Sequence, residues 1–291
     1  MISVVIPTYN EAQELPGCLA ALRDQAAHRL IVADGGSIDG TGQIAAAAGA
    51  VLVACGVRQR AAQMNLGARR AEGDVLVFLH ADIRLPVGAL AAVEHAVTGG
   101  AVGGCFRLRL EGPSPVLRAM EPLGDWHCRA TRTTFGDRAI FARRDAFEAA
   151  GGYPVQEIME DVELGRRLKR LGRLEVSSLT VTASARHFNR QGGAWVAVKA
   201  AVCCGLYDLG VAPRRLARFY WGQAYADGLE GAAPSGTWPS VTGQGDAEPA
   251  GRWQGGGSMP GGTSSGYSHS RAGNAGPSSP GQGGAQEGRN S

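Results

Sequence analysis

The sequence has very little lysine. Of its 29 basic residues only Lys169 and Lys199 are lysine, and the formal net charge of the 291 residues is +3. The arginines are scattered along the chain, so no concentrated basic surface of the kind that binds nucleic acid is predicted. Nucleic acid is therefore not an expected partner.

Zinc-type cysteine motifs are also missing. The six cysteines form no CxxC pair, and no histidine stands at the interval from them that a zinc site would need. Neither a structural zinc site nor a framework of disulfides is predicted. We expect free thiols in a reducing compartment.

Long apolar runs are absent as well. The residues after Met1 lack the basic start and long apolar centre of a signal peptide. The longest apolar stretch, residues 195–211, is interrupted by Lys199 and Asp208 and is shorter than the ~20 residues that a membrane span needs. We expect a cytoplasmic protein in which this stretch forms a core or interfacial helix, with at most peripheral membrane contact.

What the sequence does have is an alternation of strand and helix patterns in its first hundred residues. Short β-branched or apolar runs predict strands at 2–6, 30–33, 51–54 and 74–79. Apolar residues at helical spacing predict helices at 11–25, 39–48 and 59–71. This alternation predicts an α/β fold of Rossmann-like type, with a mostly parallel central sheet and helices on both faces.

The pattern of predicted elements changes after residue 100, and the composition changes again from residue 231. A longer strand at 101–110, an Arg- and Trp-bearing segment up to residue 132, and a helix at 160–171 are expected to complete the same domain and hold the acceptor. From Gly231 onward 17 of 61 residues are Gly. Such a segment buries too little apolar surface to fold, so we predict a domain at 1–222 and a disordered, Gly/Ser/Pro-rich tail at 223–291.

Polar clusters directly follow three of the predicted strands, at residues 8–11, 34–37 and 80–82. The carboxyl ends of parallel strands lie at one edge of a sheet, which is where open α/β sheets bind their ligands. Asp34 stands in a glycine-rich turn, where it could accept a hydrogen bond from a base or ribose. An ordinary strand-to-helix turn is the alternative interpretation.

Carboxylates occupy two further positions where chemistry is expected. Asp82 at a strand end is a hard oxygen ligand suited to Mg²⁺ or Mn²⁺ that also holds phosphates, although it could instead cap the turn before Pro86. Glu160 and Asp161 begin a predicted helix, where carboxylates also favour the helix dipole. Beside a cleft, this pair could provide a general base for a sugar hydroxyl.

Two segments resemble the nucleotide-binding motifs of the family 2 glycosyltransferases of the GT-A fold. They are VVIPTYNE at 4–11 and IVADGGSIDGT at 31–41. Four others, RAAQMNLGA at 60–68, FLHAD at 78–82, GDRAIF at 136–141 and MEDVEL at 159–164, are similar to a bacterial subgroup associated with radical-SAM proteins and selenoproteins. The resemblance extends from residue 1 to about residue 222.

This resemblance implies a UDP- or GDP-sugar donor and a Mg²⁺ or Mn²⁺ cofactor. Asp82, as the last acid of a DXD-type motif, would bind the metal that bridges the diphosphate, and His80 stands where the family usually has an acid. Asp161 would deprotonate the acceptor for in-line attack with inversion, with Glu160 as the fallback base. The matching donor-binding positions are Pro7, Tyr9, Glu11, Asp34, Arg60, Asn65, His80 and Arg186.

The acceptor is unknown and could be lipid-linked. Asp137 and Arg138 would lie near it, although these two residues could simply pair across a turn. Arg186, which follows a strand-like run at 181–185, would neutralise the diphosphate leaving group, or it could belong to a surface pair with His187.

Three other classes of protein are alternatives to a glycosyltransferase. A nucleotidyltransferase would normally have a Gly- and Lys/Arg-rich loop after the first strand. This chain has PTYNE at residues 7–11 instead, which favours sugar transfer. A non-catalytic nucleotide-sugar-binding protein remains an alternative. A dinucleotide-dependent oxidoreductase is disfavoured because no GxGxxG follows the first strand.

Overall fold

The computed structural model describes residues 1–25, 27, 29–112, 115–184 and 193–222. Contacts divide the chain into Met1–Gly236 and Thr237–Ser291, and all described residues belong to the first unit. The predicted tail at 223–291 and the predicted diphosphate contact Arg186 lie outside the described residues.

The described strands form one eight-stranded sheet in the order β3-β2-β1-β4-β7-β6-β8-β5. Their bounds are β1 Ile2–Thr8, β2 Arg29–Asp34, β3 Val51–Ala54, β4 Val75–Phe78, β5 Ile83–Arg84, β6 Gly103–Leu110, β7 Ile140–Arg143 and β8 Leu174–Ala183. Strand β1 pairs in parallel with β2 and β4, β3 pairs in parallel with β2, and β7 is antiparallel to both β4 and β6. The predicted α/β fold with a mostly parallel sheet is confirmed.

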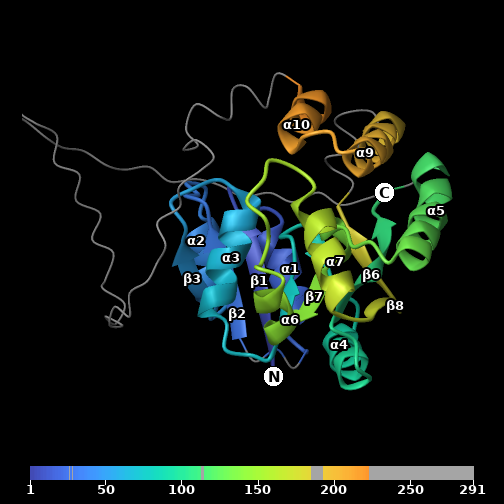
Figure 1. Cartoon of the computed structure of the whole chain (residues 1–291). Coiled ribbons are helices and arrows are strands. Elements are labelled where there is room, and N and C mark those ends of the chain that lie inside the picture. The colour runs from blue at the N-terminus through green and yellow to red at the C-terminus, as the bar shows by residue number, and fades with distance from the viewer. Residues whose placement is uncertain (26, 28, 113–114, 185–192, 223–291) are drawn as a thin grey trace, which may run out of the picture. The chain divides into compact units, whose positions relative to one another are not determined.

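Helices lie on both faces of this sheet (Figure 1). They are α1 Leu15–Leu22, α2 Thr41–Ala47, α3 Arg60–Arg70, α4 Ala89–Thr98, α5 Pro115–Thr131, α6 Arg144–Ala149, α7 Glu160–Leu171, α9 Gly193–Asp208 and α10 Pro213–Trp221, with a short 3₁₀ turn η1 at Gly136–Arg138. Because side chains alternate along a strand, Val4 and Ile6 of β1 pack in the core with α1 and α4, whereas Val5 packs in the core with α3. Each such fully buried side chain contributes roughly 1.5–3 kcal/mol.

Helix α3 approaches the sheet very closely at Gly67. A Cβ at this position would overlap Cγ1 of Val5 and lie 3.4 Å from Cβ of Ala33. We expect Gly67→Ala to lower the free energy of unfolding by about 1–3 kcal/mol, because overpacked cores must shift backbone or rotamers. Chemical denaturation measures this loss. Gly205→Ala in α9 is the control and should not be destabilised, because no atom would lie within 4 Å of the added carbon. A Gly67→Ala variant as stable as wild type would contradict this packing.

Two elements differ from the sequence-based expectation. Residues 115–131, expected only as an Arg- and Trp-bearing segment, form α5, which contains Pro122 in its interior. Residues 83–84 form the short strand β5, which pairs with β8. The helices expected at 160–171 and 195–211 are found as α7 and α9. Within the described part of the chain, no helix is long and apolar enough to cross a membrane.

The last two helices pack over the start of α7. Met159 and Val162 form a small apolar cluster with Cys203 of α9 and Leu216 of α10. Met159 has a φ of 65°, a strained value for a residue with a side chain, and its burial in this cluster holds it there. The cluster therefore fixes the turn from which α7 begins.

Candidate active site

A pocket of about 300 Å³ opens at the carboxyl ends of β1 and β4. Loops after these two strands and the first turn of α3 supply its walls. Its lining contains the predicted residues Pro7, Tyr9, Glu11, Arg60, His80 and Asp82, together with Thr8, Arg58, Gln63 and Ala81. The structure thus brings together residues that are separated by as much as 75 positions in the sequence, as the strand-end pattern predicts.

Asp34 organises the loop that follows β2. Its Oδ1 accepts from Oγ1 of Thr8 at 2.8 Å, and its Oδ2 accepts from the backbone N–H groups of Gly36 and Ser37 at 3.0 and 2.8 Å. Burial acts to raise the pKa of Asp34, but the hydrogen bonds from Ser37, Thr8 and Gly36 outweigh it and keep the pKa below its usual value. Asp34 is therefore an ionised carboxylate at the carboxyl end of β2, beside Thr8 of the pocket.

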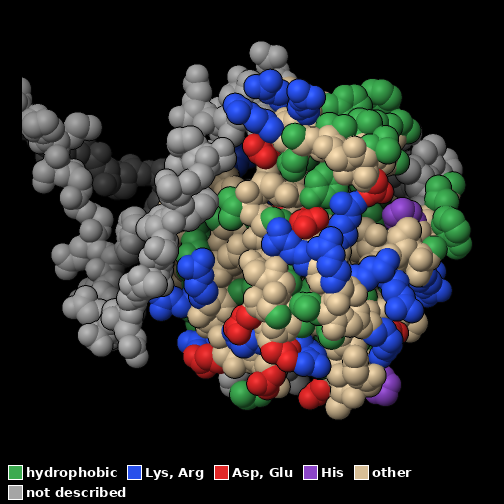
Figure 2. All heavy atoms as spheres, viewed as in Figure 1, with side chains coloured by type: hydrophobic (Ala, Val, Ile, Leu, Met, Phe, Trp, Pro, Cys, Tyr) green, Lys and Arg blue, Asp and Glu red, His purple; other side chains and the backbone are tan. Residues whose placement is uncertain are grey.

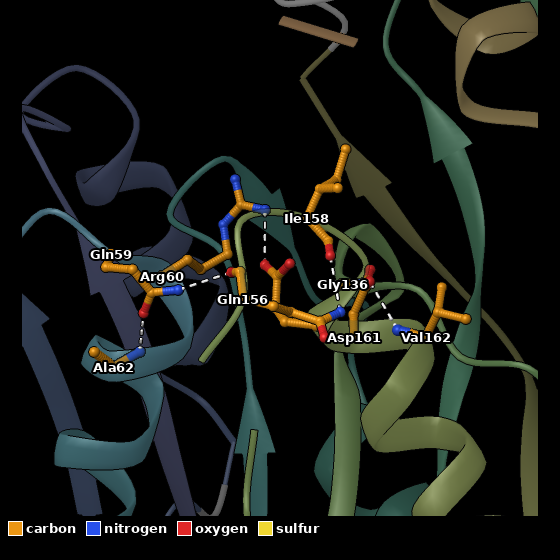
Figure 3. A network of polar contacts seen from close by, with 9 residues as sticks. Gln59, Arg60, Ala62, Gly136, Gln156, Ile158, Asp161 and Val162 are labelled. Atoms are coloured by element: carbon orange, nitrogen blue, oxygen red, sulfur yellow. Dashed lines mark hydrogen bonds and ion pairs between the residues drawn. The ribbon is translucent and has the colours of Figure 1, made fainter. Parts of the chain in front are cut away.

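Glu160 and Asp161 belong to the first turn of α7. Figure 3 shows Asp161 on one side of the close-up and Arg60 of α3 on the other. Oδ2 of Asp161 accepts from the N–H of Gly136 at 2.6 Å, and its Oδ1 accepts from the N–H of Val162 at 2.8 Å. Oε1 of Glu160 lies 3.4 Å from Nη1 of Arg60. The two acids thus have different partners: Asp161 has backbone N–H groups and Glu160 has a cation.

Burial raises the pKa of both acids. For Glu160 burial outweighs the charge of Arg60, and the negative charge of Asp161 adds to the effect, so its pKa rises to about 7. For Asp161 burial outweighs the N–H groups of Gly136 and Val162 and the charge of Arg60. A carboxylate with a raised pKa is a stronger base when ionised, which suits proton abstraction near neutral pH.

His80 connects the pocket with Asp161. A Cβ on Gly136 would lie 3.1 Å from Cε1 and Nε2 of His80 and 3.3 Å from Oδ2 of Asp161, so these groups crowd around one glycine. Burial, reinforced by the charge of Arg60, lowers the pKa of His80 to about 3. The imidazole is therefore neutral at physiological pH and can donate or accept a hydrogen bond.

Asp137 and Arg138 have different surroundings in the structure. Buried Arg138 pairs with Asp125 of α5, Nη1 to Oδ1 at 2.5 Å, and Asp125 also accepts from Nε of Arg107 at 2.7 Å. Asp137 is half-buried, and its Oδ1 is a buried atom with no hydrogen-bond partner among the described residues. Burial raises the pKa of Asp137 to about 6, against the charge of Arg138 and with the help of Asp161 and Asp82.

Asn65 lies away from the pocket lining. Its Nδ2 donates to the carbonyl of Tyr153 at 2.8 Å, and its Oδ1 accepts from the N–H of Tyr153 at 2.9 Å. Both polar atoms of the side chain are thus bonded to one backbone residue that is 88 positions away. The two hydrogen bonds of Asn65 therefore link α3 to the loop that precedes α7.

Gln63 and Arg58 line the pocket although they are not among the predicted site residues. Nε2 of Gln63 donates to the carbonyls of Thr8 and Ala33 at 2.7 and 2.9 Å, so it ties together the ends of β1 and β2. The guanidinium of Arg58 lies 4.3 Å from the ring centre of Tyr9 at the pocket wall. A glutamine within the inward, apolar face of the helix at 59–71 is the sequence signal that could have revealed Gln63.

The acidic side chains provide donors of the kind that Mg²⁺ or Mn²⁺ prefers. Within the described residues no group of three or more His, Cys, Asp or Glu is arranged to hold a metal ion. Asp82 lines the pocket, and burial, followed by the charges of Asp161 and Asp82, raises the pKa of Asp137, whose buried Oδ1 lacks a partner among the described residues. A divalent cation would relieve this repulsion, so the residues fit a metal that draws its remaining ligands from a substrate.

Comparison with solved structures identifies the fold. The mannosyltransferase PcManGT from Pyrobaculum calidifontis, solved with GDP-Man and Mn²⁺, is 21% identical, and the match covers 82% of this chain and 76% of that chain with a TM-score of 0.57. S. aureus TarS 1-349 with UDP-GlcNAc is 17% identical, and the match covers 64% of this chain and 58% of that chain with a TM-score of 0.53. The chain thus spans less than two thirds of the TarS chain, and these likenesses show the GT-A fold alone.

The family follows from the sequence of the first half. The model of Glycosyl transferase family 2 matches residues 3–152, which is more than half of the chain. The protein therefore belongs to glycosyl transferase family 2, as the two motifs at 4–11 and 31–41 suggest. A search of curated proteins gave no match.

Proposed function

We propose that this protein is a metal-dependent, inverting glycosyltransferase that moves a hexose from a UDP- or GDP-sugar to an acceptor hydroxyl. The observation that carries the proposal is that the half-buried carboxylate of Asp161 lies against the same glycine, Gly136, as His80 of a polar pocket at the carboxyl ends of β1 and β4. The narrower resemblance to the radical-SAM-associated subgroup and a cytoplasmic location are predictions from the sequence alone.

The donor nucleoside would lie against the end of β1. Pro7, Tyr9 and Glu11 line this side of the pocket, and Arg58 stacks on Tyr9. A base or ribose could use the exposed polar edges here, while the diphosphate would extend toward Arg60 and Asp82. A nucleotide-sugar donor is supported by the neighbours, since PcManGT was solved with GDP-Man and Mn²⁺ and TarS with UDP-GlcNAc.

Asp82 would hold the divalent metal together with the diphosphate oxygens. The metal would offset the negative charge of the nucleoside diphosphate as it leaves. Arg60 brings a positive charge to the same region, where its guanidinium pairs with Glu160. The chain's own residues thus contribute positioning and charge compensation in a partly water-excluded site.

Asp161 is the better placed general base of the two acids. Its two N–H partners fix its orientation, and among the described residues each oxygen accepts one such bond, which leaves a second lone pair to accept a proton from the acceptor hydroxyl. Glu160 is more deeply buried, and its carboxylate faces the cation of Arg60. Attack by the deprotonated hydroxyl in a single displacement would invert the anomeric carbon.

The test is donor turnover. UDP- and GDP-sugars with Mn²⁺ should release nucleoside diphosphate, faster with a suitable acceptor, and NMR of the first-formed product should show an inverted anomeric configuration. Release of sugar 1-phosphate in place of nucleoside diphosphate would instead indicate nucleotidyl transfer, because attack at the phosphorus next to the nucleoside leaves the phosphate on the sugar. Retention of configuration would remove Asp161 from its role as the base in a single displacement.

The charge of Arg60 predicts a shift in the pH dependence of turnover. Arg60 lowers the pKa of Asp161, so Arg60→Gln should raise that pKa further. The base is active when ionised, so the acid limb of kcat at saturating donor should move to higher pH. Arg58→Gln, in the same pocket, should weaken donor binding and leave the acid limb in place. An acid limb that Arg60→Gln leaves unchanged would argue against Asp161 as the titrating base.

A further inference from the structure

Helix α9 exposes a continuous apolar stripe. Trp195, Val198, Val202 and Gly205 are exposed, and Leu209 directly after the helix is 82% exposed. Their spacing of three and four residues places them on one face of the helix. The opposite face is used for packing, because Val196 and Cys203 are fully buried. The stripe is thus fixed in its outward orientation.

Helix α5 adds a second apolar stripe, and it contacts α9. Leu123 and Trp126 are 62% and 65% exposed, and the small side chains of Ala119 and Ala130 lie on the same face. The buried face of α5 is fixed by the ion pair of Asp125 with Arg138. Figure 2 shows the hydrophobic side chains gathered over α9 and α5.

Helix α10, which packs on α9, borders this apolar surface with positive charge. Arg214, Arg215 and Arg218 are exposed, next to Phe219, which is 46% exposed. The sequence of α10 contains no acid, and Asp208, the only acid in the sequence of α9, already pairs with Arg166. Figure 2 shows the corresponding Lys and Arg side chains clustered beside the hydrophobic ones.

We propose that the face formed by α5, α9 and α10 binds the surface of a bilayer that contains anionic lipid. Tryptophan and aliphatic side chains beside an arginine cluster match the acyl boundary and the phosphate layer of such a bilayer. A second copy of the chain fits this face less well, because a symmetric contact would bring the same arginines together.

Binding to the bilayer does not depend on the proposed transferase activity. What it implies about the acceptor does rest on that activity. Because α9 and α10 pack on Met159 and Val162, which flank Asp161 closely in the sequence, the bound face would set the base beside the bilayer. That position suits an acceptor anchored in the membrane.

The test is flotation of the full-length protein with lipid vesicles. We expect binding to vesicles of phosphatidylcholine mixed with phosphatidylglycerol, and weaker binding when the phosphatidylglycerol is omitted or salt is added. The double variants Trp126→Ser/Trp195→Ser and Arg214→Glu/Arg215→Glu should each lower the affinity by roughly tenfold or more. All four side chains are exposed, so circular dichroism should show an unchanged fold.

Matched controls come from elsewhere on the surface. Val87→Ser removes an apolar side chain that is 93% exposed, and Arg69→Glu/Arg70→Glu reverses two exposed charges at the end of α3. Both controls should bind vesicles as wild type does. Absence of vesicle binding by the full chain, or equal loss in controls and test variants, would overturn the proposal. Self-association that Trp126→Ser/Trp195→Ser abolishes, without vesicle binding, would identify a second copy as the occupant and also overturn it.

Discussion

Asp161→Asn is expected to reduce kcat by roughly 10²–10⁴-fold, the usual contribution of a positioned general base. Asparagine has the shape of aspartate, but its amide cannot take a proton from an acceptor hydroxyl. The side chain lies outside the lining of the donor pocket, so affinity for the nucleotide sugar should change little. Single-turnover kinetics and donor titration would measure the two effects separately.

The amide also has only one acceptor oxygen, whereas Asp161 accepts from both Gly136 and Val162. We therefore expect a loss of stability of about 1–3 kcal/mol, which must be measured beside the rate. Glu163→Gln is the matched control, because it also replaces a carboxylate of α7 by an amide. Glu163 pairs with Arg167, so this variant should keep the wild-type rate. If Asp161→Asn keeps its rate and Glu160→Gln loses it, the roles of the two acids are reversed.

Asp82→Asn should abolish the part of donor binding that depends on metal. The neutral amide is a weaker ligand for a hard cation. Loss of a residue that only orients a metal ligand costs roughly 10–100-fold in affinity, and loss of a ligand itself should lower the affinity for Mn²⁺ with nucleoside diphosphate by more than that. Calorimetric titration of nucleoside diphosphate with and without Mn²⁺ measures this directly.

Asp74→Asn provides the comparison for Asp82. Asp74 stands at the other end of β4, exposed and paired with the N-terminal amine, far along the strand from the pocket. This variant should bind nucleotide as wild type does. Equal metal dependence in wild type and Asp82→Asn would show that the metal, if required, is held elsewhere.

The grouping of residues in the pocket could be predicted because it depends on topology alone. Val75 to Phe78 is apolar at every position, which indicates a strand buried on both faces, and β1 and β4 are parallel neighbours. The residues that follow two such strands must lie close together at one edge of the sheet. For this reason the sequence pattern is sufficient to group Pro7, Tyr9, His80 and Asp82.

Other contacts around the pocket are ones that a linear pattern does not encode. The partner of Arg138 is Asp125, which lies on a helix with a proline in its interior. Asn65 belongs to a motif that resembles a binding sequence, yet its side chain bonds to Tyr153 across 88 positions. Such pairings arise from packing of distant segments, so sequence spacing gives no access to them.

The central claim is that the pocket binds a nucleotide diphosphate sugar through a metal. The most direct test is thermal denaturation of the wild-type protein with UDP, GDP and their sugars, each with and without Mn²⁺, since a ligand of the native state raises Tm. We predict that one of the two nucleotide series raises Tm with Mn²⁺ and has little effect without it. If neither series raises Tm at any concentration of Mn²⁺ or Mg²⁺, the protein is not the transferase proposed here.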